Sequence, residues 1–131
     1  EVEHVADALV LETDDLLITA SPGAHAVPVV GLRVVDKVNG GVMAYSCDTE
    51  RSALITAMAR GADLLIHEAT GKGPGHSSST DAARVAADAS VSRLALVHLP
   101  PARYFDTEAL AEARRIFPNL AVGADGDRYE F

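Results

Sequence analysis

From about residue 49 onward, segments with helical spacing alternate with short apolar runs. The spacing of apolar residues and the capping residues predict helices at residues 50–60, 79–89 and 107–117. The short apolar runs predict strands at residues 62–68, 93–99 and 120–124. Strands joined through helices run parallel in one sheet, because a parallel connection needs a long crossover. This alternation predicts a parallel α/β arrangement, and it limits the possible folds more than any other feature.

The first part of the chain has a strand-rich pattern instead. Strands are expected at residues 8–12, 16–20, 27–35 and 42–46. Asn39 and Gly40 lie between the last two runs, and an Asn-Gly pair flanked by apolar residues is a hairpin signal. No repeat, low-complexity tract or linker interrupts the sequence, so we expect a single domain over residues 1–131. The whole pattern predicts an α/β (α+β) fold with a mixed β-sheet.

Several of the expected strands are apolar at nearly every position, which is typical of strands with both faces covered. With 48% apolar and 23% charged residues, the chain can bury a core. The three expected helices can cover one face of the sheet. The other face requires a partner that this chain does not obviously contain.

Charge and composition exclude some classes of function. The formal net charge of −8 gives no general attraction for a phosphate backbone, so a nucleic-acid substrate would need a metal ion, a helix N-terminus or a basic element elsewhere. No apolar run approaches the length of about 18 residues that a membrane span needs, and the first residues lack a signal-peptide pattern. A single cysteine, Cys47, fits a reducing compartment. We therefore expect a soluble, cytoplasmic protein without a membrane partner.

Polar residues gather where the expected strands end, and ligands of such sheets bind at the carboxyl ends of strands. Four of the five histidines and one aspartate lie at or near these ends, and His4 is the exception. The residues that follow or end an apolar run are His25, Asp48, His67, Glu68, His98 and, before a helix, His76.

Each of these residues also has a purely structural interpretation. A single histidine at a strand end is often a hydrogen-bonded structural residue, and Asp48 could cap the helix that follows it. His76 could be a turn residue with its ring in solvent, and His4 is expected on the surface. The chemical interpretation is that His25, Asp48 and His98 converge on a metal ion, since imidazole and carboxylate suit zinc. Catalytic zinc takes about three protein ligands per ion, so either the site holds one ion or further ligands come from elsewhere.

Five segments of the sequence, in order and spanning residues 18–104, resemble the metallo-β-lactamase fold. They are ITASPGAHAVPVVGLRV, MAYSCDT, ADLLIHEAT, GHSSSTDAA and LALVHLPPARY. Within that superfamily the chain is most similar to ribonuclease Z, the endonuclease that trims the 3′ end of precursor tRNA. That fold is a four-layer αββα sandwich of two similar halves. The resemblance implies that this chain is the C-terminal half, and the N-terminal His-x-His-x-Asp-His motif of the family is absent from it.

The resemblance also implies a metal site with two zinc ions in the complete fold, with manganese or iron as alternatives. His25 would bind the first ion, Asp48 would bridge both and His98 would bind the second. The sequence departs from the usual family pattern at two places near this site. Cys47 stands where glycine is usual, and one more residue than in the tRNA-processing members separates His98 from Arg103.

The roles implied for the remaining residues are catalytic or substrate-binding. His76 would donate a proton to the leaving oxygen, and Glu68 would orient that histidine. Ser77 and Ser78, at the start of a helix, would hold a phosphate oxygen. Arg103, with Tyr104, would be a substrate or structural contact.

The resulting functional prediction is a zinc-dependent hydrolase of ribonuclease Z type. In such an enzyme a metal-bound hydroxide attacks a phosphodiester, and precursor tRNA is a possible substrate. This chain alone is expected to be inactive without the missing N-terminal half or a homodimer partner. One alternative is a metallo-hydrolase of the same fold that acts on a small ester or another small molecule. The other is a non-catalytic half-domain that associates with a partner.

Overall fold

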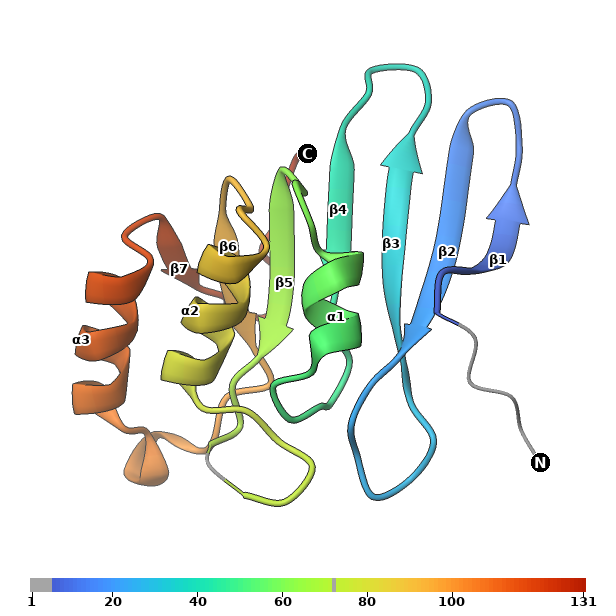
Figure 1. Ribbon diagram of the computed structural model, residues 1–131. Coiled ribbons are helices and arrows are strands. Elements are labelled where there is room, and N and C mark those ends of the chain that lie inside the picture. The colour runs from blue at the N-terminus through green and yellow to red at the C-terminus, as the bar shows by residue number, and fades with distance from the viewer. Residues whose placement is uncertain (1–5, 72) are drawn as a thin grey trace.

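The computed structural model describes residues 6–71 and 73–131, and these residues form one seven-stranded sheet. The strands lie in the sheet in the order in which they occur in the sequence (Figure 1). They are β1 (Ala8–Glu12), β2 (Leu16–Pro22), β3 (Val30–Asp36), β4 (Val42–Tyr45), β5 (Leu64–Glu68), β6 (Leu94–Val97) and β7 (Leu120–Val122). His4, which the sequence places on the surface, lies outside the described residues.

The sheet is mixed, as the sequence predicts. Strands β1 to β4 form an antiparallel meander, and β4 to β7 pair in parallel. The turn between β3 and β4 contains the Asn-Gly pair. Gly40 there has a φ of 83°, which is accessible to glycine without strain, and its N–H donates to the carbonyl of Asp36. The predicted hairpin is therefore confirmed.

Three α-helices, α1 (Ala53–Met58), α2 (Ser79–Asp88) and α3 (Thr107–Ile116), lie on the same side of the sheet (Figure 1). A short 3₁₀ helix, η1 (Ala102–Tyr104), precedes α3. Side chains of Ser52, Ser78 and Asp106 cap the N-termini of the three α-helices. Helix α1 is shorter than predicted, because Ser52 caps it and the residues before Ser52 lie in a loop.

The hydrophobic core lies between the helices and the sheet. It is formed by α1 and α2 packing on the central strands, and its largest buried side chains include Ile55, Met58, Leu65, Val85 and Leu96. Small residues allow this close packing. A Cβ atom on Gly31 of β3 would lie 2.8 Å from Cδ1 of Ile55 and 2.9 Å from Cε of Met58, so glycine lets α1 approach the sheet.

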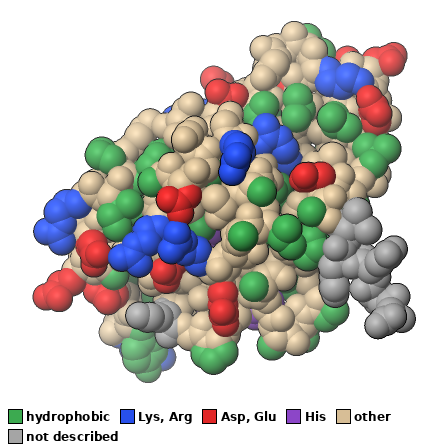
Figure 2. Space-filling model, in the orientation of Figure 1, with side chains coloured by type: hydrophobic (Ala, Val, Ile, Leu, Met, Phe, Trp, Pro, Cys, Tyr) green, Lys and Arg blue, Asp and Glu red, His purple; other side chains and the backbone are tan. Residues whose placement is uncertain are grey.

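The outer surface of the helices carries charges of both signs (Figure 2). Nη2 of Arg51 is 2.6 Å from Oδ2 of Asp88, and Nη2 of Arg84 is 3.7 Å from Oε1 of Glu112. These exposed pairs contribute little stability individually. Since arginines are paired with carboxylates here, this face does not form a uniformly basic surface, in agreement with the acidic composition.

The side of the sheet away from the helices is covered unevenly. The C-terminal segment returns to it: the chain ends behind the sheet near β4 (Figure 1), and a Cβ on Gly41 would lie 2.4 Å from the backbone of Phe131. At the other end, every residue of β1 is exposed, and Leu11, which the register places on this side, is 44% exposed. The sequence predicts an uncovered face, and the structure adds that the chain's own C-terminus covers part of it.

Candidate metal and catalytic site

The loops that follow β2, β4 and β6 meet at one edge of the sheet. His25 lies after β2, Asp48 after β4 and His98 after β6, and the loop before α2 brings His76 to the same edge. Strands β2 and β4 both run antiparallel to β3, and β4 runs parallel to β6, so all three end on the same side. The topology therefore brings together residues that are up to 73 positions apart, from His25 to His98.

The side chains predicted as metal ligands lie close together. Nδ1 of His98 is 2.8 Å from Oδ1 of Asp48, and both side chains are partly open to solvent. Ligand atoms of His25, Asp48 and His76 all lie within 4.8 Å of one another. A second group, made of Glu68, His76 and His98, meets the same limit. His76 belongs to both groups, which the sequence does not indicate.

The three histidine rings form a row with His76 in the middle. The ring centroids of His25 and His76 are 5.0 Å apart, and those of His76 and His98 are 5.8 Å apart. Both pairs are close to perpendicular. This arrangement places His76 between the two outer histidines.

His25 is held by a backbone carbonyl. Its Nδ1 lies 2.8 Å from the carbonyl oxygen of Gly75. A carbonyl can only accept, so Nδ1 carries the proton in this contact and Nε2 has its lone pair available. A histidine held in this way presents Nε2 to a metal ion.

Glu68 is a buried carboxylate with an unusually complete set of partners. It is 1% exposed, and its Oε1 accepts hydrogen bonds from the backbone N–H groups of Thr49 (3.2 Å) and Ser77 (2.9 Å). Its Oε2 accepts from the N–H of Thr70 at 2.8 Å. These bonds compensate for its burial. Nδ1 of His76 lies 3.1 Å from Oε1, so the carboxylate fixes the orientation of this ring and leaves Nε2 of His76 free.

The two serines expected to bind phosphate use their donors inside the protein. Ser77 is buried, its N–H donates to Glu68 and its hydroxyl donates to the carbonyl of Thr49. Both the N–H and the hydroxyl of Ser78 donate to the carboxylate of Asp81, which closes the capping box of α2. In this structure the donors of both residues are engaged in positioning Glu68 and capping the helix, so their phosphate-binding role stays a prediction.

Arg103 and His67 lie apart from the histidine row. Arg103 is exposed in η1, with its guanidinium 4.8 Å above the ring of Tyr104. His67 is fully buried, two residues after the core residue Leu65 in β5, and its Nδ1 contacts the carbonyl oxygen of Glu68 at 2.8 Å. Burial lowers the pKa of His67 below its ordinary value of 6.5, although the neighbouring acidic groups oppose this shift. His67 is therefore a neutral core residue.

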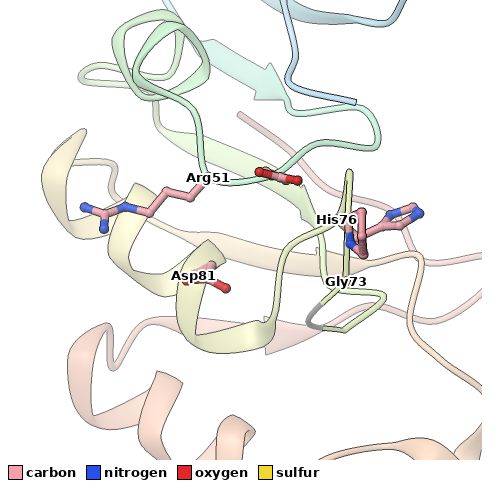
Figure 3. A pocket seen from close by; sticks show the side chains of 6 residues that line it. Arg51, Gly73, His76 and Asp81 are labelled. Atoms are coloured by element: carbon pink, nitrogen blue, oxygen red, sulfur yellow. The ribbon is translucent and has the colours of Figure 1, made fainter. Parts of the chain in front are cut away.

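An open pocket of ≈ 460 Å³ lies beside His76 (Figure 3). It is lined by Glu50, Arg51, Gly73, Pro74, His76 and Asp81. In Figure 3, His76 and Gly73 lie on one side of this pocket, and Arg51 and Asp81 lie on the other. Sequence reasoning missed Glu50 and Gly75. The run of glycines before His76 is the signal that could have indicated a tightly packed loop at this place.

Comparison with known proteins shows which fold the chain has and which proteins it is similar to. No protein-family model matches the chain. Over 90 residues, or 63% of the chain, the sequence is 46% identical to the ribonuclease Z of Metallosphaera sedula. The structure matches the metallo-β-lactamase fold protein YhfI from Bacillus subtilis with a TM-score of 0.77, at 25% identity over 91% of this chain and 51% of that one. The chain is ribonuclease Z-like and has the metallo-β-lactamase fold.

This ribonuclease Z-like chain also matches the short form of human tRNase Z. The TM-score is 0.69 at 25% identity, and the match covers 89% of this chain and 44% of the human one. The match to the Metallosphaera protein covers 31% of that protein, so the chain spans about a third of the length of the curated relatives it matches. The predicted resemblance and fold class are thereby confirmed.

Proposed function

We propose that this chain is the C-terminal half of a metal-dependent phosphodiesterase of ribonuclease Z type. The observation that carries the proposal is the meeting of His25, Asp48 and His98 around His76 at the edge of a sheet. The similarity to ribonuclease Z of other organisms supports the same reaction class. Precursor tRNA is the substrate that this similarity favours.

The residues present fit a metal ion of the zinc type. Two imidazoles and a carboxylate are typical zinc donors, and two ligands of one zinc ion lie roughly 3–4 Å apart. The ligand atoms of His25 and Asp48 lie within 4.8 Å of each other, and Nδ1 of His98 is 2.8 Å from Oδ1 of Asp48, so only small movements are needed to reach this range. His25 and Asp48 would hold one ion, and Asp48 and His98 a second. When bound, such ions supply a nucleophile from water at neutral pH and polarise a phosphoryl oxygen.

His76 and Glu68 would carry the proton transfer. Glu68 fixes Nδ1 of His76, so the free Nε2 can hold the proton that the leaving oxygen of the substrate needs. Glu68 is itself fixed by three backbone N–H groups, so its own position does not depend on the substrate. The same geometry allows His76 to act as a metal ligand, and the two roles predict different results on mutation.

The ligands supplied by this chain do not complete two zinc shells, and the remaining ligands would come from an N-terminal half. The His98 side chain is 49% exposed and the Asp48 side chain is 36% exposed, so both are accessible to such a partner. The length of the related proteins leaves room for this half, because the chain covers 31% of the Metallosphaera enzyme. The chain alone would then be inactive, as the sequence also predicts.

Mutation of His76 in the full-length protein tests this function. The wild type should contain about two zinc ions per subunit and cleave bis(p-nitrophenyl) phosphate and precursor tRNA. We expect His76→Ala to slow cleavage by about 10²-fold or more with an unchanged metal content. His25→Ala should lose metal as well as activity. Normal turnover by His76→Ala would exclude the proton-transfer role, and loss of metal in this variant would make His76 a ligand instead.

Substrate choice separates the phosphodiesterase from the alternatives. Turnover of small esters together with failure to cleave precursor tRNA would favour the small-molecule hydrolase. If the full-length protein binds no metal and cleaves neither kind of substrate, the non-catalytic half-domain is the alternative that remains.

A further inference from the structure

Residues directly after Asp48 connect the loops that carry His25 and His76. The Thr49 hydroxyl accepts a hydrogen bond from the N–H of Ala24, and the N–H of Glu50 donates to the carbonyl of Ala24, both at 2.8 Å. On the other side, Oε1 of Glu50 accepts a hydrogen bond from the N–H of Gly75, also at 2.8 Å. Glu50 therefore contacts the loop of His25 through its backbone and the loop of His76 through its side chain.

Gly75 is the residue through which Glu50 reaches His25. Its N–H binds Glu50, and its carbonyl oxygen contacts Nδ1 of His25. A Cβ on Gly75 would lie 2.3 Å from Nδ1 of His25, and its φ of 81° is one that side chains rarely allow. Only glycine permits this approach, and glycine is also the residue whose backbone is least restrained by itself. The position of the Gly75 carbonyl therefore depends on its hydrogen-bond partners.

We propose that Glu50 is a positioning residue, which fixes Gly75 so that the Gly75 carbonyl selects the Nδ1–H tautomer of His25. This tautomer leaves the Nε2 lone pair for a metal ion. The relevance to catalysis rests on the metal site proposed above, but the effect on the tautomer does not require metal. Glu50 differs from Glu68, which is buried and acts on His76, because its carboxylate reaches the ring through a backbone carbonyl.

Substitutions at Glu50 can separate the effect of its hydrogen bond to Gly75 from the effect of its negative charge. Glu50→Gln keeps an oxygen that can accept from Gly75 and removes the charge. Glu50→Asp keeps the charge but is shorter by one methylene group, so it cannot reach Gly75 without a movement of the loop. Glu50→Ala removes both. If positioning is the role of Glu50, the Gln variant behaves like the wild type and the Asp and Ala variants do not.

The first measurement is long-range ¹H–¹⁵N NMR of the histidine rings in the full chain labelled with ¹⁵N-histidine and freed of metal by a chelator. His25 of the wild type should be in the Nδ1–H form at pH 8, and Glu50→Gln should keep this form. Glu50→Ala and Glu50→Asp should show a mixture of tautomers, while the remote control Glu108→Ala should not. An unchanged His25 tautomer in Glu50→Ala overturns the proposal, whether or not the protein binds metal.

The second measurement is zinc affinity by competition with a chelating dye. Partners of a metal-binding histidine typically contribute 10–100-fold in affinity, so we expect about tenfold weaker binding in Glu50→Ala and Glu50→Asp. Glu50→Gln should bind zinc as the wild type does. The reverse order, with Glu50→Asp normal and Glu50→Gln weakened, would mean that charge is what matters and would overturn the positioning role. If no variant and no wild type binds zinc, the proposed function fails, while the tautomer measurement still decides the role of Glu50.

Discussion

His67 is a histidine that the fold keeps out of the candidate site. It precedes Glu68 directly, but alternation along β5 turns it into the core, where it is fully buried. Among the residues that the structure describes, its Nε2 has no hydrogen-bond partner. A charged imidazole is poorly tolerated there, which is the cause of its lowered pKa.

This burial predicts a dependence of stability on pH. In the unfolded chain His67 has its ordinary pKa of 6.5, and in the folded chain the pKa is lower. The unfolded state therefore binds the proton more strongly, so the stabilisation is complete above pH 6.5 and is lost as the pH falls below that value. Urea unfolding of the wild type should give a free energy that declines from pH 7 to pH 5. In His67→Leu the decline should be smaller, and an identical decline in both proteins would contradict the assignment.

Single residues of the site could be predicted from the sequence only where their chemistry is distinctive. His25, Asp48 and His98 follow apolar runs, and strand ends are where parallel sheets gather polar side chains, so their convergence could be predicted. Gly75 and Glu50 could not be predicted, because their roles depend on a close approach between loops that are 25 residues apart in sequence. The direction of the Ser77 and Ser78 donors could not be predicted for a related reason: they face Glu68 and Asp81, and a sequence pattern does not show where a donor points.

At the scale of elements, helix α2 is capped by hydrogen bonds at both of its ends. Its N-terminus has a capping box between Ser78 and Asp81. At its C-terminus, the N–H of Ser90 donates to the carbonyl of Ala87, and the N–H of Val91 donates to that of Ala86. These two bonds form a Schellman motif. Both ends matter for the site, because the helix begins three residues after His76 and its first turn borders the pocket beside that residue.

Loss of the capping box should destabilise the protein without changing the chemistry of the site. In Ser78→Ala the N–H of Asp81 loses its acceptor, and an N-cap substitution of this kind costs about 1 kcal/mol. We expect a reduction of this size in the free energy of unfolding, measured by urea titration. Zinc affinity should stay at the wild-type value. If Ser78 instead binds the substrate, Ser78→Ala would raise KM for a phosphodiester with no change in stability.

The C-terminal end of α2 offers a substitution that should stabilise the chain. Ser90 has a φ of 54°, in the left-handed region where a side chain costs roughly 1–2 kcal/mol and glycine does not. Part of this gain is offset by the greater freedom of glycine in the unfolded chain. Ser90→Gly should therefore raise the free energy of unfolding by up to about 1 kcal/mol, while Ser92→Gly, on a residue without a positive φ, should not raise it.

The elements themselves were predicted almost completely, since each has a clear local pattern. The exceptions have long-range causes. Helix α1 begins at Ala53 rather than at residue 50, because Thr49 and Glu50 are bonded to the loop of His25. The return of the C-terminal segment onto the sheet has no apolar periodicity that could indicate it. Gly41, against which Phe131 lies, is in the sequence merely a turn residue.

The two faces of the sheet differ in the molecule as a whole: helices cover the first face, and the second face is only partly covered. On the first face, the outer surface of the helices carries charged side chains of both signs (Figure 2). No helix in residues 6–71 and 73–131 has the length and apolar character required to cross a bilayer. On the second side, register and alternation place Leu11 and Val30 on the face away from the helices, where they are 44% and 54% exposed. A large contiguous patch of such side chains is typical of an interaction surface, so this face is the candidate for one.

This difference between the two sides predicts how the chain behaves by itself. If an N-terminal half normally covers the second face, the isolated chain should bury that face by self-association, and sedimentation should show mass increasing with concentration. The double substitution Leu11→Lys and Val30→Lys places two charges on the face and should shift the chain toward monomer. Val38→Lys is the matched control, because Val38 is 76% exposed but lies in the turn after β3 rather than on the face. A wild-type chain that stays monomeric at every concentration, or a Val38→Lys variant that dissociates as readily as the double variant, would show that this face does not drive association.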